Sequence, residues 1–410
     1  MSIGKEVEAL ILDLGEFSEE PEALTRPAYS KAYERAAEYL VDRFKGAGLC
    51  VSCDYAGNIF GRLEGTDPQL APIVIGSHLD TVRDAGKYDG IAGICCGLHA
   101  LLHLNKSGKK LKHPVELAAF IGEEGTRFGQ VLLGSRYTCG ELTPQQMSAF
   151  HDERGIYFPE IISHYQNGNL PLHGMLCDDK PACFIELHDE QGPILENSNV
   201  QVGLVESIVG IFRLNVEVSG ESGHCGTVPM SLRHDAGIAA FDFLVSAVDF
   251  AAARYGDKVT LTAGQLTLLP GSINSIPGQC SFTIDLRSAE IEKLVDIKAK
   301  LLDIADSVSK RRKVAISVTE SMEKPPVKMD GTLNSLLERC SESLGLSAVR
   351  LNSGAGHDAM VMAGITDAAM IFLPCFKGIS HNPLEYISAD ALENGVLLLA
   401  ETIVHFDNME

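Results

Sequence analysis

The sequence has no excess of basic residues, no apolar run as long as a membrane span and no basic segment ahead of an apolar block. Its 34 Lys and Arg residues are outnumbered by 55 Asp and Glu residues, so the formal net charge is −21. Nucleic acids and anionic membranes bind proteins through basic surfaces, and we therefore expect neither as a partner. The first residues lack the features of a signal peptide, and we expect a cytoplasmic protein.

The cysteines show no disulfide pattern. There are eleven of them, an odd number scattered along the chain. Cys50 and Cys53 form a CxxC pair, but no second pair follows, which argues against a structural zinc ribbon. Both lie in the strand-like segment LCVSCDY, where we interpret them as ordinary core or edge residues. This usage fits a reducing compartment.

The first part of the chain alternates helical and strand-like segments. The length of 410 residues suggests two or three domains, and the apolar fraction of 45% allows a large buried core. The alternation predicts an α/β layer with a largely parallel central sheet. The expected helices cover 28–48 and 90–106, and the expected strands cover 49–54, 58–63, 72–77 and 115–121.

The middle of the chain follows a different order, strand, helix, strand, strand, helix, strand, which is typical of a ferredoxin-like domain. These elements are expected at 208–218, 232–254, 258–268, 279–287, 289–309 and 313–320. The α/β pattern then resumes, with helices at 332–344 and 389–406 and strands at 348–352 and 367–373. We therefore predict a discontinuous domain over 1–207 and 325–410, with helices flanking a mostly parallel sheet, and an inserted ferredoxin-like α+β domain over 208–324.

One polar motif follows the apolar strand IVIG. His78 and Asp80 come just after this strand, at the edge where open α/β sheets bind ligands. On an extended backbone, Asp80 could orient a metal-bound His78 through the second ring nitrogen. Asp89 opens the next helix in YDGIAG, where a carboxylate is also favoured as an N-terminal cap. Both roles remain open for Asp89.

Three more strands lead to ionisable residues at the same edge. VELAAFI precedes Glu123 and Glu124, which are costly together unless a cation or a proton neutralises them; a solvated acidic turn is the alternative. Two other strands precede His188 and His381. A lone histidine is more often structural than a ligand, but this shared placement indicates a nitrogen and oxygen set suited to two zinc or similar divalent ions. The candidate ligands are His78, Asp89, Glu124, His188 and His381.

Such a set predicts two-metal hydrolysis of an amide. Two cations about 3.5–4 Å apart that share a carboxylate can polarise a carbonyl group and lower the pKa of a bridging water. A free carboxylate must then take the proton of that water and pass it to the leaving nitrogen. Glu123 is our candidate for this base.

An ordered set of motifs resembles the aminoacylase/carboxypeptidase-type binuclear metallohydrolase superfamily, and most of all its hydantoinase/carbamoylase branch. The motifs are GSHLDT, YDGIAG, EEG, ELHDEQG, GHCGTVPM, SGAGHDA and GISHNP, and the resemblance covers nearly the whole chain. The branch contains N-carbamoyl-L-amino-acid hydrolases, β-ureidopropionases and allantoate amidohydrolases. The resemblance implies a catalytic di-metal domain with an inserted lid and dimerisation domain.

For the metals, the resemblance implies one ion on His78 and His188, a second on Glu124 and His381, and Asp89 between them. Zinc, manganese, cobalt and nickel are all compatible with this ligand mixture. The expected cofactor is therefore two divalent metal ions per subunit.

For catalysis, the resemblance implies Glu123 as the base and Asp80 as the residue that orients His78. His224 in SGHCGTVP matches a histidine that reaches across from the partner subunit and stabilises the oxyanion. The resemblance thus implies a homodimer with a shared active site. Taken alone, His224 lies in a Gly-rich loop and could equally be structural.

For substrate binding, the resemblance implies that Asn274 and Arg287 hold a carboxylate of the substrate. Gln191 and the backbone near Gly356 match further substrate contacts. Arg287 ends the apolar strand CSFTIDLR, and its two-pronged guanidinium suits a carboxylate, although a surface arginine is the alternative. The expected partner is a small ureido or amide substrate with a carboxylate.

The sequence departs from the branch at two places. Allantoate-cleaving members tend to carry a polar GQxR-like segment, which here reads IVGIFRL, with Ile211 and Phe212 at the matching positions. An arginine for a second ureido group is therefore missing, and the neighbouring Arg213 should face away from Phe212 by strand alternation. An apolar residue there suits the side chain of an N-carbamoyl amino acid. Asp189, in ELHDEQG, stands where the branch more often has an apolar residue.

These observations favour hydrolysis of an N-carbamoyl-L-amino acid to the L-amino acid, carbon dioxide and ammonia. The alternatives with the same residues are allantoate amidohydrolase and β-ureidopropionase activity, followed by a dipeptidase or aminoacylase. A non-catalytic binding protein that kept the fold is the alternative from a different class. Loss of a metal ligand would favour it, and none is lost.

Overall fold

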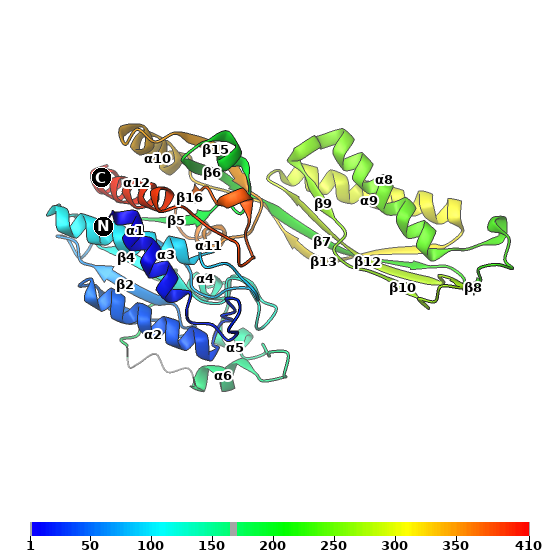
Figure 1. Cartoon of the computed structure of the whole chain (residues 1–410), viewed down its shortest axis with the longest axis horizontal. Coiled ribbons are helices and arrows are strands. Elements are labelled where there is room, and N and C mark those ends of the chain that lie inside the picture. The colour runs from blue at the N-terminus through cyan, green and yellow to red at the C-terminus, as the bar shows by residue number, and fades with distance from the viewer. Residues whose placement is uncertain (1, 165–169, 410) are drawn as a thin grey trace. The chain divides into compact units, whose positions relative to one another are not determined.

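The protein consists of two compact units, one inserted into the other along the chain (Figure 1). A computed structural model describes residues 2–164 and 170–409. The first unit comprises Met1–Glu206 and Lys328–Glu410, and the second comprises Ser207–Val327.

The first unit is built on a nine-stranded sheet with the order β1-β2-β4-β3-β5-β16-β6-β14, in which β15 also pairs with β6. The central strands β4, β3, β5 and β16 are parallel, whereas β1, β2 and β6 join by antiparallel pairing. The predicted α/β fold with a largely parallel centre is confirmed. The strands are β1 Cys50–Cys53, β2 Ile59–Leu63, β3 Ile73–His78, β4 Val115–Phe120, β5 Cys183–Asp189, β6 Val202–Ile208, β14 Val327–Lys328, β15 Ala348–Ser353 and β16 Ala368–Leu373.

Every residue of the four central strands is buried, as expected for parallel strands covered on both faces. Helix α3 packs on β3, β4 and β5, α12 packs on β16, and α2 packs on β1 and β2. The long helices of this unit are α1 Ile3–Leu14, α2 Lys31–Gly46, α3 Ile91–Ser107, α10 Gly331–Ser343 and α12 Ala389–Asp407. The short ones are α4 Leu133–Thr138, α5 Pro144–Met147, α6 Phe158–His164, α7 Ile194–Ser198 and α11 Asp358–Met362.

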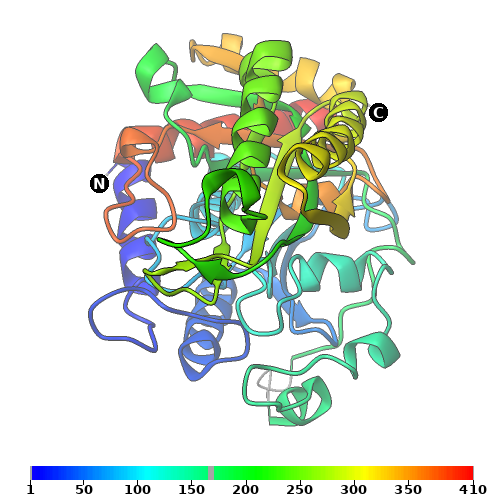
Figure 2. The ribbon, with the colours of Figure 1, turned by 90° about the vertical axis from the view of Figure 1, so that its right-hand side faces the viewer.

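The second unit has the predicted ferredoxin-like order. Its antiparallel sheet runs β10-β12-β7-β13, with β9 also paired to β12, and helices α8 and α9 lie side by side on this sheet (Figure 1). The same two helices are green and yellow in Figure 2. The elements are β7 Gly210–Ser219, β8 Gly223–His224, α8 Ala236–Tyr255, β9 Thr260–Thr262, β10 Leu266–Leu269, β11 Ser275–Ile276, β12 Gln279–Ser288, α9 Ile291–Arg312 and β13 Ala315–Lys324.

Two expectations for this unit were wrong in detail. The strand expected at 258–268 is split into β9 and β10, which pair with different parts of β12. Gly264 lies in the break, where a residue without a side chain weakens a strand. Helix α8 begins at Ala236 rather than near 232, because the Asp235 carboxylate accepts hydrogen bonds from the N–H groups of Gly237 and Ile238 and caps the helix there.

Helix α8 is also unusually apolar. By length and composition alone, Ala236–Lys258 could cross a membrane, a property that core helices of soluble proteins share. Here one side of the helix packs in the core of the second unit, through Ala240, Phe243 and Ala247.

Candidate metal centre

The candidate metal ligands come from five segments that end at one edge of the large sheet. His78 is the last residue of β3, and His188 is the penultimate residue of β5. Asp89 lies just before α3, Glu124 follows β4, and His381 follows β16. The carboxyl ends of parallel strands share one edge, so the topology brings these residues together.

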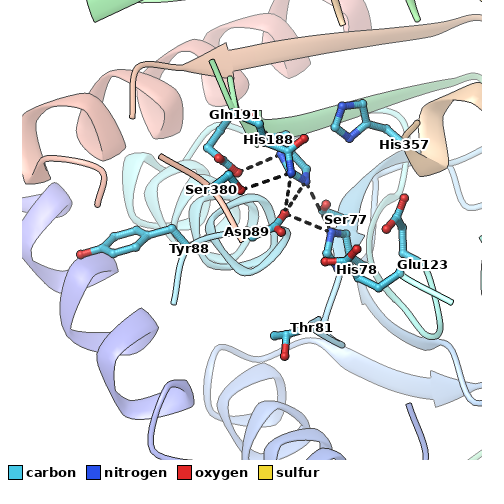
Figure 3. Close-up of polar contacts among 12 residues, drawn as sticks. Ser77, His78, Thr81, Tyr88, Asp89, Glu123, His188, Gln191, His357 and Ser380 are labelled. Atoms are coloured by element: carbon cyan, nitrogen blue, oxygen red, sulfur yellow. Dashed lines mark hydrogen bonds and ion pairs between the residues drawn. The ribbon is translucent and has the colours of Figure 1, made fainter. Parts of the chain in front are cut away.

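Asp89 is the centre of this cluster (Figure 3). Its Oδ1 lies 3.2 Å from His188 Nε2 and 3.6 Å from His78 Nε2, and its Oδ2 lies 3.1 Å from His381 Nε2. The Nε2 atoms of His78 and His188 are 3.4 Å apart, and Glu124 Oε1 lies 3.6 Å from His381 Nε2. One carboxylate therefore faces three imidazoles from both of its oxygens.

The donor atoms fit divalent cations. Three groups have all their donor atoms within 4.8 Å of one another: His78, Asp89 and His188; His78, Glu123 and Glu124; and Asp89, Glu124 and His381. Among the described residues, the buried oxygens Asp89 Oδ2 and Glu124 Oε1 have no hydrogen-bond donor. Buried carboxylate oxygens without donors, next to imidazole nitrogens, are the environment that zinc and similar ions occupy.

The protonation equilibria reflect the same crowding. Burial would raise the pKa of Asp89, but contacts with three histidines hold it well below its usual range. The Asp89 carboxylate raises the pKa of His381 to about 9. Burial raises the pKa of Glu124 to about 8. Without cations the cluster retains protons, and a bound cation would compete with them for the same oxygens and nitrogens.

The role expected for the Asp80 side chain is corrected by the structure. His78 Nδ1 lies 3.0 Å from the backbone carbonyl oxygen of Asp80, not from its carboxylate. The carboxylate accepts hydrogen bonds from the backbone N–H groups of Gly122, Glu123 and Glu124, at 2.8, 3.1 and 3.3 Å. Asp80 thus orients His78 through its main chain and fixes the loop of the two glutamates through its side chain.

Glu123, the predicted base, is buried beside this cluster and is 8% exposed. Burial raises the pKa of Glu123 well above its usual range, and the neighbouring Glu124 adds to this effect. Figure 3 shows its side chain near His78 and directed away from Asp89. The two adjacent glutamates therefore differ, because Glu124 faces His381 whereas Glu123 does not.

Gln191, a predicted substrate contact, borders the cluster. Its Nε2 lies 3.4 Å from Asp89 Oδ1, 3.4 Å from Ser380 Oγ and 3.5 Å from His381 Nε2. Gly356, the other predicted contact in this unit, directly precedes His357 at the start of α11.

Two supporting residues were missed by the sequence reasoning. Glu385 Oε2 accepts hydrogen bonds from the N–H groups of Tyr88 and Asp89, at 2.8 and 3.0 Å, and its Oε1 accepts one from Ser380 Oγ. His357 lies in the motif SGAGHDA, and its ring centroid is 4.5 Å from that of His188. Burial lowers the pKa of His357 well below its usual range, so this ring remains neutral.

The remaining predicted residues lie in the second unit. His224 is at the end of β8, exposed and paired in register with Ser275 of β11. Asn274 directly precedes β11, and its carbonyl oxygen accepts a hydrogen bond from the N–H of Cys225. The structure therefore brings His224 and Asn274 onto neighbouring segments, whereas Arg287 lies on β12.

Arg287 shares a carboxylate with a second arginine. Its Nε lies 2.7 Å from Asp285 Oδ1, and Arg213 Nε lies 2.8 Å from Asp285 Oδ2. In the pairing of β7 with β12, Ile211 is opposite Arg287 and Arg213 is opposite Asp285. These four side chains lie on one face of the sheet.

Phe212 is the residue whose expected role was wrong. It is fully buried, and its ring packs in the core of the second unit. Lys298 of α9 lies over this ring, 5.2 Å from its centroid. Because strand neighbours alternate faces, Phe212 lies under the helices and Ile211 lies on the face of Arg287. Phe212 is therefore a core residue and not a substrate contact.

A mostly parallel α/β sheet with imidazoles and carboxylates gathered at the carboxyl ends of its strands defines a class of metal-dependent hydrolases. Residues 74–405 match Peptidase family M20/M25/M40, and the chain belongs to this family. Within it the chain belongs to the hydantoinase/carbamoylase branch, whose members are amidohydrolases acting on C–N bonds. Two metal ions are typical of the family.

Individual relatives cover almost the whole chain. An N-carbamoyl-L-amino-acid amidohydrolase of Paenarthrobacter aurescens is 36% identical, over 98% of this chain and 97% of the relative. A ureidoglycolate hydrolase of Oryza sativa subsp. japonica is 37% identical, over 95% of this chain and 81% of the relative. The solved structure of a hydantoinase/carbamoylase family amidase from Burkholderia multivorans is similar with a TM-score of 0.92 and 29% identity, over 98% of this chain and 97% of that one.

Proposed function

We propose that the protein hydrolyses N-carbamoyl-L-amino acids to the L-amino acid, carbon dioxide and ammonia. The observation that carries the proposal is the position of Asp89, whose two oxygens face three imidazoles beside a pair of buried glutamates. The similarity to an N-carbamoyl-L-amino-acid amidohydrolase over nearly the whole chain supports the choice of substrate.

In this proposal His78 and His188 would hold one cation, Glu124 and His381 would hold a second, and Asp89 would be a ligand shared by the two. The candidate ions are zinc, manganese, cobalt and nickel. When bound, such ions polarise the ureido carbonyl group and acidify a water molecule. The protein must then provide a base that lies close to the metal ligands but does not itself bind a metal.

Glu123 is that base. Its burial keeps the pKa of its carboxyl group high, which favours proton uptake from water and delivery of the same proton to the leaving nitrogen. The hydrogen bond from its backbone N–H to Asp80 fixes the position of its main chain. Because Glu123 takes up one proton and then passes it on, it returns to its starting protonation state at the end of each turnover.

The second unit supplies the remaining groups of the proposal. His224, from the partner subunit, stabilises the oxyanion, and Asn274 and Arg287 bind the carboxylate of the substrate. Gln191 and the backbone at Gly356 complete the contacts in the first unit. The proximity of Gln191 to Asp89 and His381 supports a contact near the reacting carbonyl group.

A homodimer is part of the proposal, because His224 acts from the partner. Helix α8 presents apolar side chains with exposures between 38% and 61%, spaced three or four residues apart: Ile238, Phe241, Val245 and Val248. A second copy of this chain would cover this stripe. Mixing inactive Glu123→Gln protein with inactive His224→Ala protein should restore part of the activity. Absence of rescue in confirmed heterodimers would contradict the shared site.

A second candidate function has a specific observation in its favour. Arg213 lies on the same face as Arg287, so a substrate with a polar group at its second end, such as allantoate or a ureidoglycolate, also has a basic partner. The 37% identity to a ureidoglycolate hydrolase supports this alternative. N-carbamoyl-β-alanine is the remaining substrate of this type.

The test is a substrate panel with the metal-loaded protein. We expect an N-carbamoyl-L-amino acid to give the highest kcat/KM among carbamoyl amino acids, N-carbamoyl-β-alanine, allantoate and ureidoglycolate. Faster turnover of allantoate or ureidoglycolate would reject the substrate choice and favour the second candidate.

The assigned base is tested by substitution. Glu123→Gln should lower kcat by about 10²–10⁴-fold and leave the metal content unchanged. Glu116→Gln is the matched control, since Glu116 is a buried carboxylate of β4, the strand that precedes Glu123, and it contacts Arg62 and His173 instead of the cluster. Normal turnover by Glu123→Gln would show that another group is the base.

A further inference from the structure

Asp189 is a buried carboxylate that the mechanism above does not use. It is the last residue of β5, directly after His188, and it is 0% exposed. Neither carboxylate oxygen has a hydrogen-bond donor within the part of the chain that the structure describes. An ionised group in this position is costly unless a nearby positive charge compensates it.

The only cationic or imidazole group that the structure places in contact with the Asp189 carboxylate, within residues 2–164 and 170–409, is the ring of His188. Asp189 Oδ1 lies 3.0 Å from His188 Nδ1, and the backbone carbonyl oxygen of Asp189 lies at the same distance from that nitrogen. The geometry fits a hydrogen bond between His188 Nδ1 and the carbonyl oxygen. The contact between Nδ1 and the carboxylate is a short ion-pair contact. The other ring nitrogen of His188, Nε2, is the one that faces Asp89.

His78 provides an internal comparison. Its Nδ1 also lies 3.0 Å from a backbone carbonyl oxygen, that of Asp80, but the Asp80 carboxylate is engaged with three backbone N–H groups. The two imidazoles are thus oriented by the same main-chain contact. His188 differs because it has an additional carboxylate at Nδ1.

The other ionisable groups near Asp189 are acidic and add no positive charge to its surroundings. Asp189 contributes to the raised pKa values of Cys375 and Glu385, whose first cause in each case is burial. Among the described residues, no lysine or arginine side chain contacts its carboxylate. The residues that follow β16 therefore supply no positive charge to Asp189. A cation bound at Nε2 of His188 would supply one.

We infer that Asp189 is a positioning residue for the metal centre, whose carboxylate fixes the His188 ring through Nδ1 and strengthens its Nε2 as a ligand. This inference rests on the metal centre of the proposed function and is independent of the substrate. Carboxylates behind a metal-binding imidazole fix its orientation and increase its basicity. Here the sequence neighbour of the ligand itself provides the carboxylate.

The experiment compares Asp189→Asn and Asp189→Leu with the unchanged protein in a competition between the protein and a chromophoric chelator for Zn²⁺. Loss of such a carboxylate typically weakens metal binding by about 10–100-fold. We expect this loss for one of the two ions, larger for Leu than for Asn. With Co²⁺ as the probe, the visible absorption spectrum of that site should also change.

Stability provides the second readout. In the metal-free protein the Asp189 variants should lose less unfolding free energy than a control that removes hydrogen bonds to a buried carboxylate, because neither Asp189 carboxylate oxygen accepts a hydrogen bond in the described part of the chain. Asp407→Leu is the matched control for Asp189→Leu: the buried Asp407 carboxylate accepts hydrogen bonds from the N–H groups of Lys112 and His113, and leucine accepts neither. This control should lower stability without changing the affinity for Zn²⁺.

Unchanged Zn²⁺ affinity in both Asp189 variants would overturn the inference. Equal weakening of both ions, together with a loss of stability in the metal-free protein as large as that of the control, would also overturn it, because a general packing role would then explain the loss. The affinities are measured without substrate, so they stand even if the substrate panel rejects the proposed function.

Discussion

Replacing Asp80 tests how the loop of the two glutamates is fixed. The Asp80 carboxylate accepts three backbone hydrogen bonds, from Gly122, Glu123 and Glu124. Asp80→Ala removes all three and leaves the N–H groups of a buried loop without acceptors. At roughly 1.5 kcal/mol for each hydrogen bond to a charged group, the loss of unfolding free energy is about 4–5 kcal/mol.

Asp80→Asn should cost less. Oδ1 accepts the bonds from Gly122 and Glu123, and the amide oxygen of asparagine can keep both. Only the bond from Glu124, the longest of the three at 3.3 Å, is lost, so we expect a cost of about 1.5–2 kcal/mol. The contact with His78 uses the main chain of Asp80 and persists in both variants.

The assay is urea unfolding of the metal-free protein, followed by fluorescence of tyrosine and by circular dichroism. Metal-free protein is required because bound cations would add their own stabilisation. Equal losses for Asn and Ala would refute the account, since it depends on the number of acceptors. A loss below about 1 kcal/mol for Ala would show that water replaces the carboxylate.

Two other substitutions test the surroundings of the site and the electrostatics far from it. Gly90 has φ +68°, and a Cβ atom there would lie 2.5 Å from the His78 ring, so Gly90→Ala should weaken Zn²⁺ binding by at least about tenfold; Gly108→Ala, with φ +71° and no atom within 4 Å, should cost only about 1 kcal/mol of backbone strain and leave metal binding unchanged. His173 lies 3.3 Å from the Glu116 carboxylate. This contact raises the pKa of His173 against the effect of burial, so its contribution is complete below about pH 6.5 and is lost as the pH rises. His173→Gln should therefore lower the unfolding free energy by about 1–2 kcal/mol at pH 5.5 and by less at pH 8.5; an equal loss at both values would show that the ring stacking on Phe60 dominates.

The gathering of the candidate ligands could be predicted from the sequence because parallel strands all point their carboxyl ends to one edge. Each candidate ligand of this kind lies at the end of, or shortly after, a strand that is buried throughout: His78, Glu124, His188 and His381. That property can be recognised from continuous apolar segments. Their roles as ligands remain predictions until metal binding is measured.

Other contacts of the site could not be predicted, for physical reasons. The spacing of His78 and Asp80 does not distinguish a carboxylate from a backbone carbonyl oxygen, and both are acceptors for an imidazole N–H. Glu385 reaches the N–H of Asp89 across 296 residues, through a loop after β16 with no periodic pattern. Phe212 was assigned to the wrong surroundings because Ile211 and Phe212 are both apolar, and alternation alone does not say which of them faces the helices.

The correction at Phe212 changes which residues we expect to select the substrate. The face of the second unit that carries Arg287 has Ile211, Arg213 and Asp285 as neighbours. Two guanidinium groups and one carboxylate leave one net positive charge on this group of residues. Such a charge favours an anionic end of the substrate irrespective of the reaction at its other end. Under the proposed function, we expect selection between a carbamoyl amino acid and a substrate with two polar ends to depend on the ion pair between Asp285 and Arg213, since Asp285 is the only carboxylate that Arg213 contacts among residues 2–164 and 170–409. Asp285→Asn would release Arg213, and the ratio of kcat/KM for allantoate to that for an N-carbamoyl amino acid should then rise; a constant ratio would show that Arg213 takes no part in the choice.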